Sequence, residues 1–179
     1  RTGIAVGDYP VDHHHEKNLE APEIDFPKVP SFNIPAGSLV AKDVPNLLMA
    51  DKAISVTNIA NGSTRLQPVI LQVGQAAGLM AAMAAQRGQR VSDMPVREVQ
   101  QGMLEAGGYL MPYYDVKPGD PHFEAIHRIG ATGLLAGTGE PYKWANRTWF
   151  YPDSILTDTA LAQGVARLGV EWNEKTGGN

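Results

Sequence analysis

Cysteine is absent from this chain of 179 residues, so disulfide bridges, thiolate metal sites and cysteine nucleophiles are all excluded. Basic residues are also few, because 15 lysines and arginines stand against 19 acidic residues, and the formal net charge is −4. A surface of that charge does not hold a phosphate backbone, so we do not expect nucleic acid as a partner. The lack of thiols leaves the compartment open, since such a protein suits oxidising and reducing surroundings alike.

The first residues lack the marks of a translated start. The segment RTGIAVGDYPV has no initiator methionine, no basic n-region and no apolar h-region, and it is typical of a strand entered partway. We therefore expect a fragment of a longer protein whose targeting segment lies outside this chain. For the whole protein we expect an extracytoplasmic location.

Several catalytic motifs are missing as well. There is no G-x-S-x-G elbow of a serine hydrolase and no G-x-x-x-x-G-K-[ST] loop of a nucleotide hydrolase. The nearest match to the dinucleotide-binding G-x-G-x-x-G turn begins at Gly137 and continues with Glu-Pro-Tyr, so it cannot serve. The run His13-His14-His15-Glu16 has no further ligands at a second spacing, and we predict no metal site.

What is present is a globular composition with many turns: 43% apolar residues, 19 glycines and 13 prolines. The pattern changes near residue 110. We predict an α+β fragment over 1–110, a small all-helical module over 111–172 and a disordered tail over 173–179. The expected elements are a short interrupted strand over 1–12, a proline-rich extended segment over 13–35, a strand Leu47–Ala50, a loop Asn58–Gln67 and helices over 68–86, 95–105, 121–130 and 158–168.

The helix over 68–86 is rich in small residues. Pro68 suits its first turn and Gly88 suits its end. Each interior glycine costs a helix about 1 kcal/mol relative to alanine, so a stripe of small residues predicts close packing against a sheet. A membrane span is the alternative, but Gln72, Gln75 and the alanine content argue against it, and we expect no membrane partner. On a 3.6-residue period the stripe consists of Gly74, Ala77, Gly78, Ala81 and Ala85.

A polar turn precedes this helix. Gly62, Ser63, Thr64 and Arg65 stand where the free amides of a helix N-terminus give a partial positive charge, to which the arginine adds its own. The turn follows the strand-like segment NLLMAD and comes before the Gly/Ala-rich helix. That order predicts a site for an anion or for the electron-rich edge of a cofactor.

The segments IAVGDYPVDHH and SLVAKDVPNLLMADKAISVTNIANGSTRLQPVILQVGQAAGLMAAMAA resemble the C-terminal portion of the FAD-dependent oxidoreductases. More narrowly, they resemble a branch labelled as xanthan lyase and found beside polysaccharide-utilising enzymes. The resemblance covers roughly residues 1–110 and implies the C-terminal part of a Rossmann-type FAD-binding fold with FAD as cofactor. It implies that the helix dipole stabilises negative charge at the N1/C2=O end of the flavin. The residues that it places against the flavin are Gly62, Ser63, Thr64, Arg65, Leu66, Pro68 and Val69.

Three further residues take roles from the resemblance. Asp51 follows the predicted strand, in Ala-Asp-Lys where the family has Ala-Gly-Arg, and would accept a hydrogen bond from the ribityl chain. In the Tyr-Pro-x-Asp-x-His pattern, His14 would act as acid or base beside hydride transfer and Asp12 would orient it. The alternative for this pair is a strand end that hydrogen-bonds its own loop.

The absence of a G-x-G-x-x-G turn predicts that this chain carries half of a flavin site. Its partner would be the missing N-terminal FAD-binding half, and the chain alone would bind FAD weakly or not at all. The substrate implied by the resemblance is a small molecule or a carbohydrate-derived compound.

The second part, from YYDVKPGDPHFEAIHRIGATGLLAGTGE to TWFYPDSILTDTALAQGVARLGV, is similar to a single S-layer homology module. Such modules come in threes and carry an arginine where this chain has Asp158, which argues against wall anchoring. The second hypothesis for function is a non-catalytic carbohydrate- or cell-wall-binding piece of a polysaccharide-processing protein. Under it Tyr142, Trp144 and Trp149 form a sugar-stacking surface, whereas a helical cap would use its aromatics to fill its own core.

Overall fold

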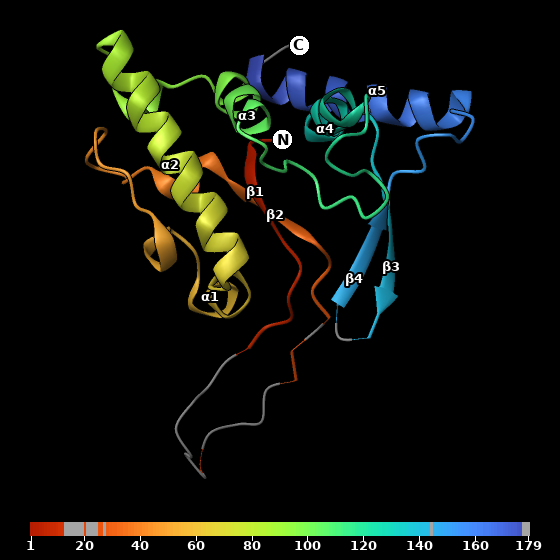
Figure 1. Cartoon of the computed structure of the whole chain (residues 1–179), viewed down its shortest axis with the longest axis horizontal. Coiled ribbons are helices and arrows are strands. Elements are labelled where there is room, and N and C mark those ends of the chain that lie inside the picture. The colour runs from red at the N-terminus through yellow and green to blue at the C-terminus, as the bar shows by residue number, and fades with distance from the viewer. Residues whose placement is uncertain (13–19, 21–24, 27, 144, 177–179) are drawn as a thin grey trace.

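The computed structural model describes residues 1–12, 20, 25–26, 28–143 and 145–176 (Figure 1). A small antiparallel sheet lies at the centre, with a long helix on one side of it and a β-hairpin on the other. The architecture is mixed α and β, with two separate two-stranded sheets among the described residues.

Strands β1 (Gly3–Gly7) and β2 (Phe32–Pro35) form the central antiparallel pair. A β-carbon on Gly7 would lie 2.5 Å from the Phe32 ring, so only glycine lets the strands approach there. Ile4 is fully buried beneath the helices. The strand predicted within 1–12 is confirmed.

Helix α2 (Gln67–Arg87) packs across β1. Both of its ends agree with the prediction, because Pro68 lies in the first turn and Gly88 ends the helix in the left-handed conformation with φ 60°. Its buried face consists of Val69, Val73, Ala76, Ala77, Met80 and Ala84.

The predicted packing stripe on this helix is wrong. Gly74 and Gly78 are exposed, and a β-carbon on either would meet no atom within 4 Å. Ala81 and Ala85 are exposed too, so Ala77 is the buried member of the stripe. The helix does lie on a sheet, but through a face in which Val69, Val73 and Met80 are combined with three alanines and no glycine. The larger side chains remove more apolar surface from water than glycine does.

Among the described residues, α2 is the helix with the length and the mean hydropathy, 1.4, of a membrane span, a test that the core helix of a soluble protein also passes. Its glutamines serve the fold. Gln72 Oε1 accepts a hydrogen bond from the Val6 N–H at 3.0 Å, and Gln75 Nε2 donates to the Ala106 carbonyl at 3.3 Å.

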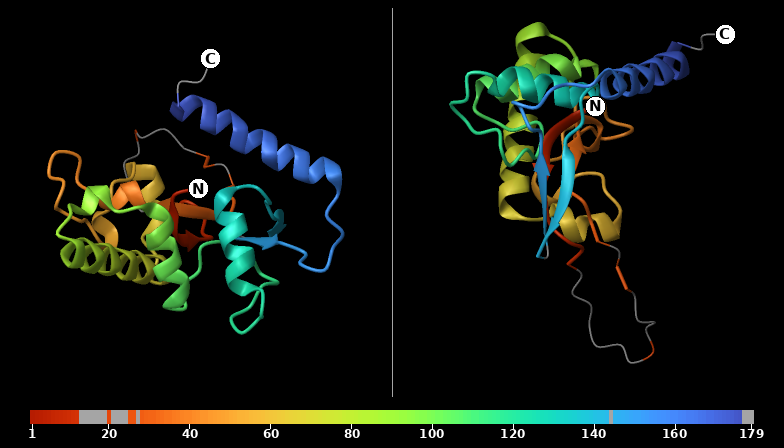
Figure 2. Two further views of the ribbon diagram at one scale, coloured as in Figure 1. Left: turned by 90° about the horizontal axis from the view of Figure 1, so that it is seen from above. Right: turned by 90° about the vertical axis from the view of Figure 1, so that its right-hand side faces the viewer.

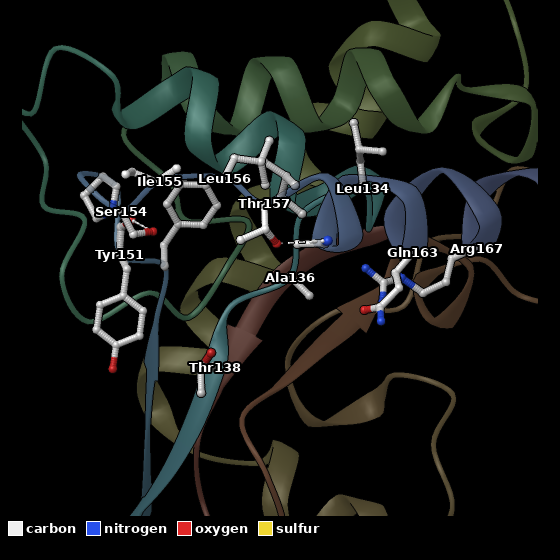
Figure 3. A pocket seen from close by; sticks show the side chains of 14 residues that line it. Leu134, Ala136, Thr138, Tyr151, Ser154, Ile155, Leu156, Thr157, Gln163 and Arg167 are labelled. Carbon is white, nitrogen blue, oxygen red and sulfur yellow. Dashed lines mark hydrogen bonds between the residues drawn. The ribbon is translucent and has the colours of Figure 1, made fainter.

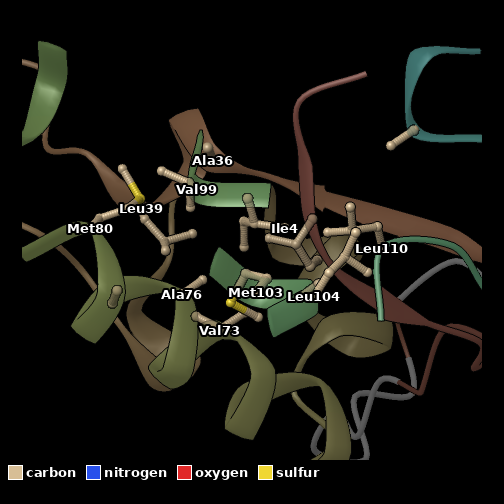
Figure 4. Close-up of a cluster of buried hydrophobic side chains, with 14 of the residues drawn as sticks. Ile4, Ala36, Leu39, Val73, Ala76, Met80, Val99, Met103, Leu104 and Leu110 are labelled. Atoms are coloured by element: carbon tan, nitrogen blue, oxygen red, sulfur yellow. The ribbon is translucent and has the colours of Figure 1, made fainter. Parts of the chain in front are cut away.

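Helix α3 (Val96–Glu105) packs against both α2 and β1. Gln100 on this helix is 3% exposed, and its Nε2 donates to the Gly3 carbonyl at 2.8 Å. Figure 4 shows the apolar core that the sheet and the two helices enclose. Its fully buried members include Ile4, Leu39, Val73, Val99, Met103 and Leu110.

Two local predictions fail in the segment before α2. The expected loop Asn58–Gln67 contains helix α1 (Asn58–Thr64). Thr57 is the N-cap of this helix, and its hydroxyl accepts a hydrogen bond from the Ala60 N–H at 3.1 Å. The expected strand Leu47–Ala50 is reduced to one bridge, between Val40 and Leu48. Three short 3-10 helices complete the first part: η1 (Ala36–Leu39), η2 (Asp51–Ala53) and η3 (Val91–Asp93).

The second part is not all-helical. Helices α4 (Phe123–Thr132) and α5 (Asp158–Thr176) flank a hairpin of β3 (Thr138–Tyr142) and β4 (Ala145–Trp149), as Figure 2 shows from two sides. Helix α5 also continues into the expected tail 173–179, of which the last three residues lie outside the described part.

The hairpin is joined to the central sheet by side-chain hydrogen bonds. Asp8, directly after β1, accepts from the Asn146 backbone N–H at 3.1 Å and from Asn146 Nδ2 at 3.2 Å. The same Nδ2 donates to the Val29 carbonyl at 2.6 Å. The parts on either side of residue 110 are therefore in direct contact.

Candidate cofactor site

The candidate site forms where the segment after β1 meets the end of α1 and the start of α2. Arg65 Nη2 donates to the Asp12 backbone carbonyl at 2.7 Å and to its carboxylate Oδ2 at 3.2 Å. Both side chains are about one-third exposed, so solvent screens the ion pair and limits its contribution to stability to about 1 kcal/mol or less. Two residues that the sequence singled out separately are thus brought together.

Gly62 lies in the last turn of α1, directly beneath Asp12. The Asp12 N–H donates to the Gly62 carbonyl at 3.4 Å, and a β-carbon on Gly62 would lie 3.1 Å and 3.2 Å from the Asp12 backbone oxygen and nitrogen. Because Gly62 has no side chain, the backbone of Asp12 can approach the helix closely. This close packing against Asp12 accounts for a glycine at position 62.

Ser63 and Thr64 differ most from the prediction. Both residues are buried, at 4% and 6% exposure, in the last turn of α1 rather than in a polar loop. Val69, 3% exposed, belongs to the core, whereas Pro68 is exposed and Leu66 is half-buried.

The start of α2 carries unpaired backbone donors. Leu66, the N-cap residue, supplies no side-chain hydrogen bond to the helix. The first amide to find a helical acceptor is that of Ile70, which donates to the Leu66 carbonyl at 3.0 Å. The amides of Gln67 and Val69 have no acceptor among the described residues, and Pro68 has no N–H. The partial positive charge of the helix end is therefore not neutralised by a capping side chain.

A buried acceptor that the sequence reading overlooked lies in α1. Asn61 Oδ1 is shielded from solvent and has no hydrogen-bond partner among the described residues. A buried polar atom left without a partner costs about 1–3 kcal/mol, so a donor brought from elsewhere would stabilise it. No sequence pattern marks Asn61 apart from its position beside Gly62.

Two further predicted site residues are not brought into this cluster. Asp51 begins η2, is exposed and has φ 57°, and among the described residues no hydrogen bond or ion pair links it to Arg65 or Asp12. His14 lies outside the described residues, as do the other two histidines of its run. In the described part of the chain, no three histidine or acidic side chains are grouped to hold a metal ion.

His127 is a buried histidine that the sequence reading did not select. Its Nδ1 accepts from the backbone N–H groups of Leu110 and Met111, both at 3.2 Å, and the Phe123 ring centroid lies 4.2 Å from its own. Burial lowers the pKa of His127 to about 4, so the ring is neutral near pH 7. These contacts make it part of the core of the second part.

A groove of about 470 Å³ lies beneath α5, in the second part of the chain (Figure 3). Its labelled walls include Leu134, Ile155 and Leu156, with Gln163 and Arg167 from the helix. None of the predicted cofactor residues lines it.

The two described residues of the alternative sugar-stacking surface, Tyr142 and Trp149, lie at opposite ends of the hairpin. Tyr142 pairs with Ala145 at the turn end of the hairpin, whereas Trp149 pairs with Thr138 at the other end. The Trp149 ring packs edge-on against Tyr114, with centroids 5.1 Å apart. Trp144 lies outside the described residues.

Comparison with known families gives one match. The family model described as FAD dependent oxidoreductase matches residues 1–103, which is more than half of the chain. No curated protein and no solved structure matches the chain. The chain belongs to the FAD-dependent oxidoreductase family, and the matched residues include β1, α1, α2 and the Arg65–Asp12 pair.

Proposed function

We propose that this member of the FAD-dependent oxidoreductases acts as a fragment of a flavin enzyme, in which the start of α2 and Arg65 face the flavin ring. The observation that carries the proposal is the uncapped N-terminus of α2 beside an arginine, within the residues matched by the family. FAD, when bound, supplies two-electron hydride chemistry. The dinucleotide end would be held by an N-terminal half that carries the G-x-G-x-x-G turn.

The start of α2 suits a ring that gains negative charge. A helix N-terminus carries about half a positive elementary charge, and the Arg65 guanidinium adds a full one. Only Nη2 of that guanidinium is engaged by Asp12, so its other nitrogens keep their donors for a ligand. The amides of Gln67 and Val69 add two neutral donors.

We also propose that Asp12 positions Arg65, and its expected role as an orienting partner of His14 stays a proposal. Its carboxylate and its backbone carbonyl both bind the guanidinium, which fixes where the positive charge stands. His14 stays our candidate for the acid or base beside the reacting carbon.

Other parts of the prediction remain proposals. Asp51 as a ribityl acceptor, Ser63 and Thr64 as flavin contacts, and a small-molecule or carbohydrate-derived substrate rest on the resemblance alone. The xanthan-lyase label and the S-layer-like identity of residues 111–172 have the same standing, and the hairpin β3–β4 departs from an all-helical module.

The Arg65→Gln variant tests the proposal in the full-length protein that contains this chain. The variant should lower the midpoint potential of bound FAD, because a positive charge that favours the reduced, anionic ring is lost. A shift of about 30 mV corresponds to about 1.4 kcal/mol for a two-electron couple, and we expect at least that. Spectroelectrochemical titration measures it.

The matched control is Arg90→Gln, which removes the same charge from a surface ion pair with Asp93. The control should leave the potential where it is in the unmodified protein. An unchanged potential in Arg65→Gln, or equal shifts in both variants, would contradict a flavin contact by Arg65. A full-length protein that is purified without flavin and does not bind added FAD would contradict the proposed function.

A further inference from the structure

A second cavity, of about 340 Å³, lies at the junction of the two parts of the chain. Its walls come from the end of β1, from Gln72 on α2, from the segment over 109–117 and from β4. It includes none of the candidate cofactor residues, so it is separate from the proposed flavin contact. Its volume falls at the small end of the range for small-molecule sites.

Several of the acceptors that line this cavity are used inside the protein. The Asp8 carboxylate accepts three hydrogen bonds from Asn146, and Gln72 Oε1 accepts one from a backbone N–H of β1. Ser31 Oγ accepts from the Thr148 hydroxyl at 3.2 Å.

The side-chain donor groups of Lys117, Arg147 and Gln72 have no carboxylate or other acceptor among the described residues. Lys117 Nζ lies 4.4 Å from the centroid of the Tyr114 ring, and the Arg147 guanidinium carbon lies 4.7 Å from the same centroid. Neither cation forms an ion pair with a carboxylate in the described part of the chain, where Gln72 Nε2 also has no acceptor. Two positive charges and the one negative charge of Asp8 therefore line the cavity, and the donors of both cations remain available to a ligand.

One wall of the cavity is the Tyr114 ring, over which both cations lie. Tyr114 is 46% exposed, and the Trp149 ring supports it edge-on at 5.1 Å between centroids. Arg147 is held in place from a second side, since its guanidinium carbon lies 3.6 Å from the centroid of the Tyr142 ring. A guanidinium fixed by stacking loses less freedom when it binds a carboxylate in the forked geometry that it favours.

We propose that this cavity binds a small carboxylate carried on a six-membered ring. The carboxylate lies between Arg147 and Lys117, which supply charge-assisted donors, and the ring lies against Tyr114. Two kinds of compound share this chemistry, an aromatic carboxylate and a uronic acid. The site does not depend on flavin, so it stands or falls independently of the proposed function.

An NMR titration of the unmodified chain tests the site. Benzoate and glucuronate represent the two sources, acetate lacks the ring, and benzyl alcohol and glucose lack the charge. We expect at least one ring carboxylate to bind about ten-fold or more tightly than its uncharged counterpart, because a hydrogen bond to a charged group contributes about 1.5–3 kcal/mol. It should also bind more tightly than acetate, because only the ring probes bury a ring against Tyr114. The preferred probe identifies the source.

Three variants complete the test. Arg147→Gln and Lys117→Gln should each weaken that binding about ten-fold or more, whereas Lys42→Gln, an exposed lysine that does not line the cavity, should leave it unchanged. Lys117 is exposed in a turn, so its substitution tests the site even if Arg147→Gln fails to fold. Equal binding of the uncharged probes, no binding of either ring carboxylate, or undiminished binding by Lys117→Gln overturns the proposal.

Discussion

His127 is a base held neutral inside the protein, which has a consequence for stability. Its pKa is lowered to about 4 by burial, against about 6.5 in an unfolded chain. Between these two pKa values His127 is protonated in the unfolded state but not in the native state. The free energy of unfolding therefore falls as the pH drops from about 6.5 towards 4. We expect the free energy of unfolding to decrease by about 2 kcal/mol between pH 7 and pH 5, measured by urea titration.

The control for this prediction is a comparison of two histidine variants. In His127→Gln that part of the pH dependence should disappear, although the variant is less stable at pH 7 because the packed ring is lost. His122→Gln changes an exposed histidine and should keep the slope of the unmodified protein. An identical slope in His127→Gln would contradict the buried neutral ring.

The sequence indicated candidate site residues but not the contacts between them. Arg65 and Asp12 were both selected, but 53 positions separate them, and no local pattern pairs two residues at that distance. Asn61 carried no signal, because an orphaned acceptor is a property of burial. Ser63 and Thr64 were expected to be accessible, since small polar residues are typical of turns, and the tertiary fold buries them.

Glycines at helical positions divide into two kinds in this fold. Gly74 is exposed in the middle of α2 with open space around it, so Gly74→Ala should raise the free energy of unfolding by about 0.5–1 kcal/mol. Gly130 in α4 is different, because a β-carbon there would collide with the Tyr113 hydroxyl and with Met111. Gly130→Ala should therefore destabilise by about 1–3 kcal/mol.

Thermal unfolding of the two alanine variants measures this contrast. Each variant adds the same methyl group to a helix, so each serves as the control for the other. Equal effects of the two substitutions would contradict the exposed placement of the α2 glycines.

Helices and strands were predicted correctly where their ends are set by residues close by in the sequence. Helix α2 was predicted almost to its ends, because a proline in the first turn and a left-handed glycine act within a few residues. Helix α1 was missed, since Asn, Gly, Ser and Thr are weak helix formers and the turn is held by Thr57 and by contacts with Asp12. The strand β3, with sequence TGEPY, is exposed along its whole length and shows no alternation of polar and apolar residues.

At the scale of the whole molecule, Asp8 joins the hairpin to the central sheet. Asp8→Ala would leave the Asn146 backbone N–H without its acceptor and Nδ2 with the Val29 carbonyl alone, and we expect a loss of about 1–3 kcal/mol. Amide hydrogen exchange should rise in 138–149 more than in α2, because the hairpin is freed locally. Asp43→Ala, at an exposed turn, is the control. Unchanged protection of the hairpin in Asp8→Ala would contradict the junction.

The family of the chain was predicted correctly, whereas its architecture was predicted only in part. The FAD-dependent oxidoreductase family is confirmed over residues 1–103. The contact across residue 110 was not predictable, since it depends on hydrogen bonds between residues 138 positions apart.

Whether this chain completes a flavin site is tested most directly by reconstitution. The chain is mixed or co-expressed with the separately produced N-terminal half and FAD, and the visible absorbance of protein-bound flavin is measured after gel filtration. We predict yellow protein with one flavin per reconstituted pair and little or none with either piece alone. A colourless complex, or full binding of FAD by the N-terminal half without this chain, would contradict the proposal that α2 and Arg65 form part of the site.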